Sequence, residues 1–228
     1  MAEATALSTA LSLRNVVRIF PGSPPVYAVG GVSIELKTGG FAALVGPSGS
    51  GKTTLLNLAA GLDTPDDGEV IIAGQKLAGM SKHDLSRFRR EKVGFVFQSY
   101  NLFPALTAIE NVEFTSIVRG DSEKESRKRA LEALEQVGLG AKAYSYPDQL
   151  SGGQQQRVAV ARSLASRPAI VFADEPTANL DSKTAIDLID LFQKLNNDLG
   201  VTFLFSTHDH RLVDRVKLSF PMSDGKLA

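Results

Sequence analysis

The chain has 228 residues, of which 43% are hydrophobic and 22% charged, and its 25 Lys and Arg balance its 25 Asp and Glu. A chain of this size and composition is expected to be globular and to bury a sizeable core. The balanced charge argues against a protein that binds nucleic acid through bulk electrostatics. Because there is no Cys, a disulfide framework, a thiolate metal site and a Cys nucleophile are excluded.

Two segments bear on the cellular location. Residues 1–13 are small and polar and lack a basic segment followed by an apolar one, so we expect no secretory signal. Residues 41–62 form the longest stretch with few charges, but Lys52, Pro47 and four internal glycines interrupt it. We therefore expect a cytoplasmic protein without a membrane span, whose role at a membrane would depend on a partner.

Short apolar or β-branched runs bounded by turn residues predict strands. They cover residues 11–19, 32–36, 41–45, 70–73, 93–97, 169–173 and 201–206. Four of the runs do not alternate with polar residues, which is typical of parallel strands covered by helices on both faces. These four begin at Phe41, Val93, Ala169 and Val201.

Helical patterns lie between the strands and predict an α/β fold. They cover residues 52–60, 122–137, 153–166 and 182–199. The second begins with the capping-box pattern Ser122-x-x-Glu125. The fourth has an apolar face formed by Leu188, Phe192, Leu195 and Leu199.

Three further segments are predicted to be turns or surface. Residues 21–25, Pro-Gly-Ser-Pro-Pro, indicate a hairpin or loop, and Asp224-Gly225 indicates a late turn. Residues 119–129 are a dense run of mixed charge, which we interpret as a solvated loop and helix face.

A phosphate-binding pattern lies between a predicted strand and a predicted helix. The segment Gly46-Pro47-Ser48-Gly49-Ser50-Gly51-Lys52-Thr53 matches G-x-x-x-x-G-K-[ST]. Small residues let backbone N–H groups surround phosphates, and the helix N-terminus adds partial positive charge. In this pattern Lys52 reaches the β- and γ-phosphate oxygens and the Thr53 hydroxyl ligates Mg²⁺. A Gly-rich turn matching by chance is the alternative, but the strand and helix around it favour nucleotide binding.

The ends of three other predicted parallel strands carry polar side chains. Residues 169–173 are followed directly by Asp174 and Glu175, and open parallel sheets bind ligands at that end. Neighbouring side chains on a strand point to opposite faces, so we expect one carboxylate to serve a metal and the other an attacking water. Gln98 and His208 follow two more of these strands and are expected to converge on the same site.

A second helix start is rich in small residues. Leu150-Ser151-Gly152-Gly153-Gln154 has the composition of an anion site but contains no Lys. Taken alone, such a start is more often a simple helix cap. If two chains meet head to tail, however, each start can contact the γ-phosphate held by the other chain, giving a two-fold interface with two sandwiched nucleotides.

Together these motifs resemble the ATPases of ATP-binding cassette (ABC) transporters over nearly the whole chain. The resemblance rests on the phosphate-binding loop, Gln98, the Leu150 to Gln154 signature, Asp174-Glu175, Asn179-Leu180-Asp181 and His208, in that order. The signature is the discriminating motif. The segments Gly61-Leu62-Asp63-Thr64-Pro65, Val96-Phe97-Gln98, Ala108-Ile109-Glu110-Asn111-Val112 and Ala173-Asp174-Glu175-Pro176-Thr177-Ala178-Asn179-Leu180-Asp181 look like the subfamily of lipoprotein-release and macrolide-export ATPases.

The resemblance implies a role for each matching residue. Catalysis is assigned to Lys52, Gln98, Glu175 and His208, with Glu175 polarising the water and His208 contacting the γ-phosphate. Mg²⁺ is assigned to Thr53, Gln98 and Asp174. ATP is assigned to Gly46, Pro47, Ser48, Gly49, Ser50, Gly51, Lys52, Thr53, Thr54, Ser151, Gly152, Gly153, Gln154 and Asp181, with Phe20 stacking on adenine. A strand-end core Phe is the alternative reading of Phe20.

The resemblance also implies an architecture and partners. We expect a single P-loop NTPase domain over residues 1–228, with an N-terminal antiparallel β subdomain and the phosphate-binding loop in 1–92, an inserted helical subdomain in 93–155 and the remaining ATPase core in 156–228. The partners would be a second copy of the chain and a membrane permease, but not nucleic acid. Residues 100–111, with Leu102 and Phe103 exposed, would receive the permease at the cytoplasmic face of the inner membrane.

Three other functions share part of this chemistry. The first is an ABC-type ATPase that drives a non-transporting membrane partner, such as a cell-division or signalling complex, and only the partner distinguishes it. The second is a DNA-maintenance ATPase, which would need long coiled-coil insertions that the sequence lacks. The third is a small-molecule P-loop kinase, which the signature and His208 disfavour.

Overall fold

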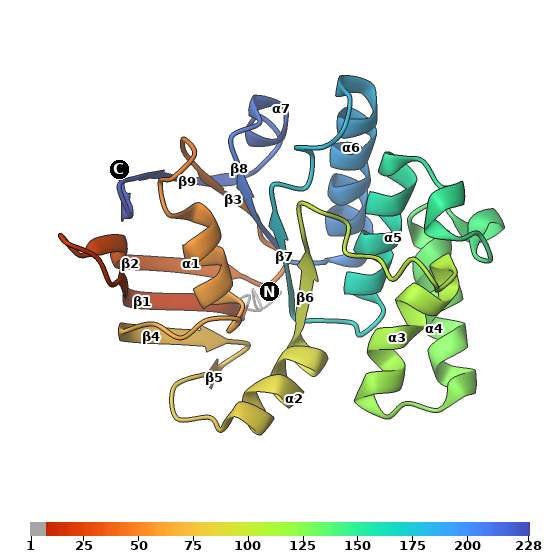
Figure 1. The fold of residues 1–228 in the computed structure, drawn as a ribbon, viewed down its shortest axis with the longest axis horizontal. Helices are drawn as coiled ribbons and strands as arrows, with labels where there is room; N and C mark the ends of the chain where they lie inside the picture. Colours follow the sequence, from red (N-terminus) through yellow and green to blue (C-terminus); the bar gives the residue numbers. More distant parts are fainter. Residues whose placement is uncertain (1–7) are drawn as a thin grey trace, which may run out of the picture.

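A computed structural model describes residues 8–228, and within them a parallel sheet runs through the centre of the fold (Figure 1). In spatial order its strands are β10 (Lys226–Leu227), β9 (Leu218–Ser223), β3 (Phe41–Val45), β8 (Phe203–Thr207), β7 (Ile170–Asp174) and β6 (Val93–Val96). The neighbouring pairs from β9 to β6 are all parallel, and β10 is antiparallel to β9. The four non-alternating runs therefore form parallel neighbours in the sheet, as predicted.

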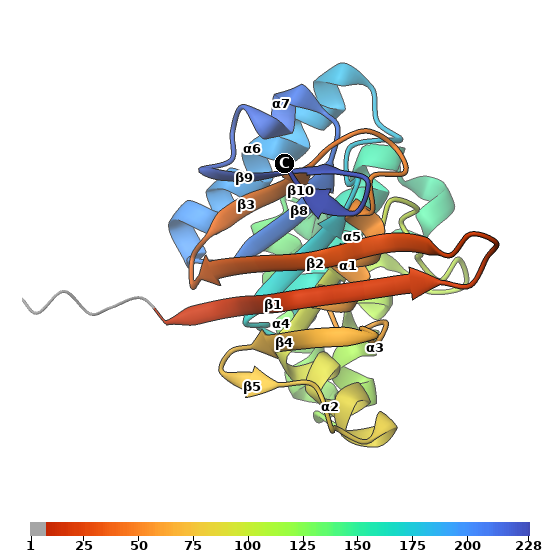
Figure 2. The same cartoon turned by 90° about the vertical axis from the view of Figure 1, so that its left-hand side faces the viewer.

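A second, antiparallel sheet lies across the first (Figure 2). Its strands, in order, are β2 (Val26–Lys37), β1 (Thr9–Phe20), β4 (Asp67–Ile72) and β5 (Gln75–Lys76). The predicted loop at residues 21–25 joins β1 to β2, whose last register pair is Phe20 with Val26. Asp224 and Gly225 form the predicted turn between β9 and β10.

Helices fill the space on both sides of the parallel sheet. They are α1 (Lys52–Ala59), α2 (Lys82–Lys92), α3 (Ala108–Arg119), α4 (Glu123–Gln136), α5 (Gly152–Leu164), α6 (Ser182–Leu199) and α7 (His210–Val213), with 3₁₀ turns η1 (Gly140–Lys142) and η2 (Pro147–Gln149). Helices α3, α4 and α5 group together on the side of β6 away from the antiparallel sheet (Figure 1). The division at residues 92 and 155 stays a prediction, and α5 runs continuously across the second of these positions.

Both faces of the parallel sheet are buried, which explains its uninterrupted apolar runs. In β3, Phe41 and Ala43 join a core formed with α3, α4, α5 and α6, whereas Ala42 and Leu44 join a core formed with α1 and the antiparallel sheet. The first core includes an aromatic group in which the Phe41 and Phe205 ring centroids lie 5.0 Å apart. Rigid strands covered on both sides are a firm support for loops at their carboxyl ends.

The structure corrects several local predictions. Leu199 is 51% exposed at the end of α6, although Leu188, Phe192 and Leu195 on the same predicted face are buried. Helices α2 and α3 and strand β9 were not among the predicted elements. Among residues 8–228, no helix is long and apolar enough to cross a membrane. The predicted absence of a secretory signal falls largely on residues 1–7, which lie outside the described residues.

The mixed-charge run at residues 119–129 is more ordered than a solvated surface. Arg119 and Arg129 both bind Asp121, Arg129 also binds Glu125, and Arg119 donates to the backbone oxygen of Ser166 at 3.1 Å. Glu125 therefore does not complete the predicted capping box, although its backbone N–H donates to the Ser122 hydroxyl. The charges connect the start of α4 to the end of α5.

Candidate nucleotide site

The phosphate-binding loop connects β3 to α1 in a conformation that only a small residue permits. Gly51 is the N-cap of α1, has φ of 96° and makes no side-chain cap. A Cβ at this position would lie 2.2 Å from the backbone oxygen of Ala28, and left-handed backbone also disfavours other residues. The first backbone N–H groups of α1 are consequently left without a capping side chain, which is the arrangement that binds an anion.

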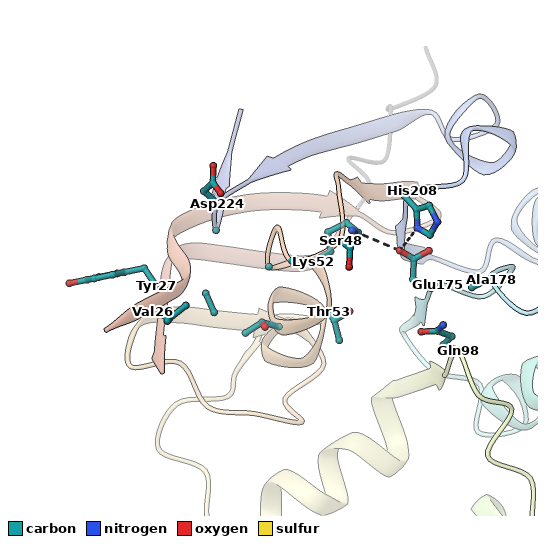
Figure 3. Close-up of a pocket in the computed structure, with 15 residues that line it drawn as sticks. Val26, Tyr27, Ser48, Lys52, Thr53, Gln98, Glu175, Ala178, His208 and Asp224 are labelled. Atoms are coloured by element: carbon teal, nitrogen blue, oxygen red, sulfur yellow. Dashed lines mark hydrogen bonds and ion pairs between the residues drawn. The ribbon is translucent and has the colours of Figure 1, made fainter. Parts of the chain in front are cut away.

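A cavity of about 590 Å³ opens over this loop (Figure 3). It is lined by residues from six chain segments that are distant in the sequence. Among them are Ser48, Lys52, Thr53, Gln98, Glu175 and His208. The strand ends that were predicted to converge therefore do so, because β3, β6, β7 and β8 present their carboxyl ends at the same edge of the sheet.

Lys52 is poised at the base of this cavity. Its side chain is only 6% exposed, and its Nζ donates to the backbone oxygens of Gly46 at 2.7 Å and Pro47 at 2.9 Å. The same Nζ lies 3.8 Å from Glu175 Oε1. A buried ammonium held mainly by carbonyl groups favours an added anion, because each further negative charge offsets its lost hydration.

Asp174 provides a carboxylate beside the loop. Its Oδ1 accepts hydrogen bonds from Thr53 Oγ1 at 3.0 Å and from the Ser206 hydroxyl. Gln98, which follows β6, lines the same cavity. A hydroxyl, a carboxylate and an amide oxygen are the hard donors that Mg²⁺ takes together with water and phosphate, so these residues fit that ion.

Glu175 is held in an uncommon backbone conformation at the end of β7. Its φ is 43°, and its N–H donates to the backbone oxygen of Ser206 at 3.0 Å. Its Oε1 lies 2.9 Å from His208 Nδ1, and its Oε2 is buried without a hydrogen-bond partner among the described residues. Figure 3 shows Lys52 and His208 both directed at this carboxylate. Because Glu175 lines the cavity beside Lys52, its carboxylate is placed to orient a water there.

The signature lies outside the lining of this cavity. Ser151 is the N-cap of α5, and its hydroxyl accepts from the Gln154 N–H at 3.3 Å while Gln154 Oε1 accepts from the Ser151 N–H at 3.0 Å. Within one chain, this segment therefore forms the helix cap that the sequence offered as its alternative role. Asp181 caps α6 in a similar manner, and the hydrogen bond from the Thr184 hydroxyl lowers the pKa of its carboxyl.

Some residues predicted to contact adenine or the permease differ in exposure or position from the prediction. Phe20 is 40% exposed at the end of β1, so it is not a core residue, and the Arg18 guanidinium lies 5.1 Å from its ring centroid. Phe20 is absent from the cavity lining within the described part of the chain, where Val26 and Tyr27 occur instead. Phe103 is 44% exposed, but Leu102 is partly buried against the core and was wrongly expected to be exposed.

Sequence reasoning missed three polar residues that hold the site together. Ser206 is fully buried between Asp174 and Glu175. Gln156 of α5 is fully buried and its Nε2 donates to the backbone oxygens of Pro176 at 3.0 Å and Phe97 at 3.4 Å. Arg162 of α5 donates to the backbone oxygens of residues 100 and 101, and burial lowers its pKa. Nothing in the local sequence marks these contacts, because their partners come from other elements.

A phosphate-binding loop at the switch from strand to helix, in a parallel sheet with carboxylates at its carboxyl edge, defines a P-loop NTPase.

Comparison with known proteins places the chain more narrowly. The family model for ABC transporters matches residues 29–178. The chain is 41% identical to the lipoprotein-releasing system ATP-binding protein LolD of Alcanivorax borkumensis, over 95% of this chain and 96% of that one. It is 43% identical to the macrolide export ATP-binding/permease protein MacB of Hyphomonas neptunium, over 95% of this chain and 34% of that one.

A solved structure leads to the same family. The dimeric post-hydrolysis state of the ATP-binding cassette MJ0796, bound to ADP and Pi, superposes with a TM-score of 0.86 at 44% identity, covering 95% of this chain and 96% of that one. The chain belongs to the ABC transporter ATP-binding family and is an ABC-type ATPase.

Proposed function

We propose that the chain hydrolyses ATP as one half of a head-to-tail dimer that drives a membrane permease, which exports or extracts lipoproteins, amphiphiles or drugs. The proposal rests on a difference between the start of α1 and the start of α5. The start of α1 lines the cavity together with Gln98, Glu175 and His208, while the signature at the start of α5 does not line it. The names of LolD and MacB support the class of cargo.

Each chain would supply the groups that hold the phosphates and Mg²⁺. Lys52 and the N–H groups of α1 would hold the β- and γ-phosphates. Thr53, Gln98 and Asp174 would hold Mg²⁺, which when bound neutralises developing charge on the phosphate oxygens. Glu175 would accept a proton from the attacking water, and His208, already 2.9 Å from Glu175, would donate to the γ-phosphate.

A second copy would supply the missing side. The Ser151 hydroxyl uses its oxygen as the cap of α5, which leaves its hydrogen free to donate across an interface. With Gly152, Gly153 and Gln154 it would contact the γ-phosphate bound by the other copy, and Asp181 would lie at the same interface. ATP would then hold the dimer together, and loss of the γ-phosphate contact would open it.

The proposed permease site is an apolar groove beside residues 100–111. It has a volume of about 380 Å³, and Phe95, Phe97, Phe103 and Phe114 line it together with two arginines, Arg90 and Arg162. The Phe103 and Phe114 ring centroids lie 4.8 Å apart, and both side chains are more than 40% exposed. The Arg162 contacts to residues 100 and 101 tie this groove to the segment that begins at Gln98, so docking there can act on the cavity.

The dimer is tested with Glu175→Gln, which keeps the shape of the side chain and removes its basicity. Turnover should fall by about 100-fold or more, because a general base typically supplies that factor. Light scattering should show that saturating Mg-ATP doubles the mass of the variant, and that ADP does not. A variant that remains monomeric with Mg-ATP would contradict the proposal.

The permease groove is tested with Phe103→Asp. The charge should abolish the stimulation of ATPase activity by a co-expressed permease that copurifies with the unsubstituted chain, because it replaces an exposed aromatic side chain of the groove with a hydrated carboxylate. Basal ATPase activity of the purified chain should stay within about twofold of the unsubstituted value. Tyr144→Asp is a matched control, since Tyr144 is 69% exposed and does not line the groove. Equal loss of basal and stimulated activity would count against the docking site.

A further inference from the structure

Ser206 occupies a position between the two carboxylates of the site. It lies in β8 as the register partner of Asp174 in β7 and is fully buried. Its hydroxyl donates to Asp174 Oδ1 and accepts from the Glu175 N–H at 3.2 Å. The hydroxyl therefore acts as a donor to one acidic residue and as an acceptor from the next. A serine that only fills space in a sheet does not need both of these contacts.

The first of these bonds fixes the orientation of Asp174. Within the described residues, the side-chain hydrogen bonds to this carboxylate come from Ser206 and Thr53, and both end on Oδ1. Oδ2 accepts no side-chain hydrogen bond among these residues and is consequently the oxygen left to bind a ligand. A donor behind a carboxylate restricts its rotation and sets which oxygen is presented, as hydrogen bonds behind metal ligands do.

The second bond supports the unusual backbone at Glu175. A non-glycine residue with φ of 43° costs free energy and persists only where its surroundings hold it. Here the Glu175 N–H is shared between the backbone oxygen of Ser206 at 3.0 Å and its hydroxyl at 3.2 Å. This conformation ends β7 and directs the Glu175 side chain toward Lys52 and His208.

We propose that Ser206 is a positioning residue of the ATPase, which orients Asp174 toward the metal of bound Mg-ATP and holds the backbone turn that presents Glu175. The inference rests on the proposed roles of those two carboxylates. Ser206 acts only through them, since its buried hydroxyl is already engaged on both sides. Its loss should weaken the contribution of Mg²⁺ to ATP binding while leaving the phosphate contacts of Lys52 intact.

The matched pair Ser206→Thr and Ser206→Val separates the hydroxyl from its packing, because Thr and Val have nearly the same shape. Ser206→Ala is the smaller variant in case the added methyl group does not fit the buried strand. Ser126→Ala is the control for loss of a buried hydroxyl remote from the site, since Ser126 is 1% exposed on α4. Thermal unfolding of each variant checks that it is folded.

The readout is the affinity of the monomer for ATP, measured by calorimetry with Mg²⁺ and again with EDTA. Ser206→Val and Ser206→Ala should reduce the gain in affinity from Mg²⁺ by about tenfold, the effect expected for a residue behind a metal ligand. Their affinity in EDTA should stay within about twofold of the unsubstituted chain, as should both values for Ser206→Thr and Ser126→Ala.

Three results separate the possible failures. An equal gain from Mg²⁺ in Ser206→Val, Ser206→Ala and the unsubstituted chain would overturn the role of Ser206 and leave the proposed function standing. So would an equal loss in Ser206→Thr and Ser206→Val, which would assign the effect to packing. A lack of any ATP binding by the unsubstituted chain would instead overturn the proposed function and, with it, this inference.

Discussion

Two helices of this protein begin in glycine-rich segments, and their first turns are arranged in opposite ways. Helix α1 begins at Gly51 without a side-chain cap, and its first turn lines the cavity. Helix α5 begins at Ser151 with a complete capping box, outside the lining of that cavity in the described residues. The first is built to receive a ligand from solution, whereas the second is already satisfied by its own side chains.

A glycine-rich helix start can therefore be capped within its own chain and still leave its capping residue exposed. At α5 the lack of a side chain at Gly153 has a packing cause, because a Cβ there would lie 2.2 Å from Thr184 Cγ2 of α6. The exposed Ser151 at the same helix start remains accessible to a partner. The start of α1 should therefore control nucleotide binding, and the start of α5 should control assembly.

The largest effect is expected at α1, from the substitution Lys52→Ala. Removing the buried ammonium leaves the carbonyl groups of Gly46 and Pro47 without their donor and removes the positive charge that faces the phosphates. The ATPase kcat/KM should fall by about 100-fold or more, the size of effect seen when one charge-stabilising donor is lost. Calorimetry should show that ATP binding to the monomer is also weakened. Lys194→Ala, on the exposed face of α6, is the control and should leave both unchanged.

At α5 the corresponding change is Ser151→Arg, which should spare the monomer. Affinity for ATP at low protein concentration should stay within about twofold, because Ser151 does not line the cavity of its own chain. ATP-dependent association and the ATPase activity that depends on it should weaken by about tenfold or more, since a bulky charge is introduced at the interface. Light scattering and ATPase assays across a range of protein concentrations measure both. A loss of ATP binding by the monomer would show that the two helix starts are not separable.

The smallest expected effect is at a third helix start, whose cap lines neither the nucleotide cavity nor the proposed permease groove. Thr107 caps α3 with a complete capping box, and its hydroxyl donates to Glu110 Oε2 at 2.7 Å. Thr107→Ala should lower the free energy of unfolding by about 1 kcal/mol. ATPase activity per folded molecule should not change, in contrast to Ser151→Arg.

The same cap predicts a pH dependence. The hydrogen bonds from Thr107 hold the pKa of Glu110 below its ordinary value of 4.5. A carboxyl whose pKa is lowered on folding stabilises the protein above its ordinary pKa and loses that contribution as the pH falls through the lowered value. The difference in stability between Thr107→Ala and the unsubstituted chain should thus shrink below pH 4.5, as measured by denaturant unfolding. A difference that grows on acidification would contradict this sign.

The parts of the fold that sequence reasoning found are those with a local signal. The apolar runs of β3 and β7 are buried on both faces, and the loop between β3 and α1 carries its motif in eight consecutive residues. Helix α2 was not predicted, because Phe88 is the one buried residue in the helix. A single buried side chain gives no repeating apolar pattern in the sequence. In α3, buried Asn111, Glu113 and Ser116 interrupt the apolar pattern.

The contacts that complete the site have no local signal. Ser206 reaches Asp174 across neighbouring strands, and Gln156 reaches Phe97 and Pro176 from a helix, so each contact depends on the assembled sheet. Gln98 and His208 were predictable only as residues that follow parallel strands, and the shared sheet edge then brought them into one cavity.

The central claim is that each ATP is held between the first turn of α1 in one copy and the first turn of α5 in the other. Because the chain has no Cys, single thiols can be introduced without background: Ser48→Cys in one preparation and Ser151→Cys in another, both with Glu175→Gln. A short thiol crosslinker should join the two preparations into a covalent dimer when they are mixed with Mg-ATP, and not with ADP. Failure of the mixed pair to crosslink with Mg-ATP, or equal crosslinking without nucleotide, would contradict the account.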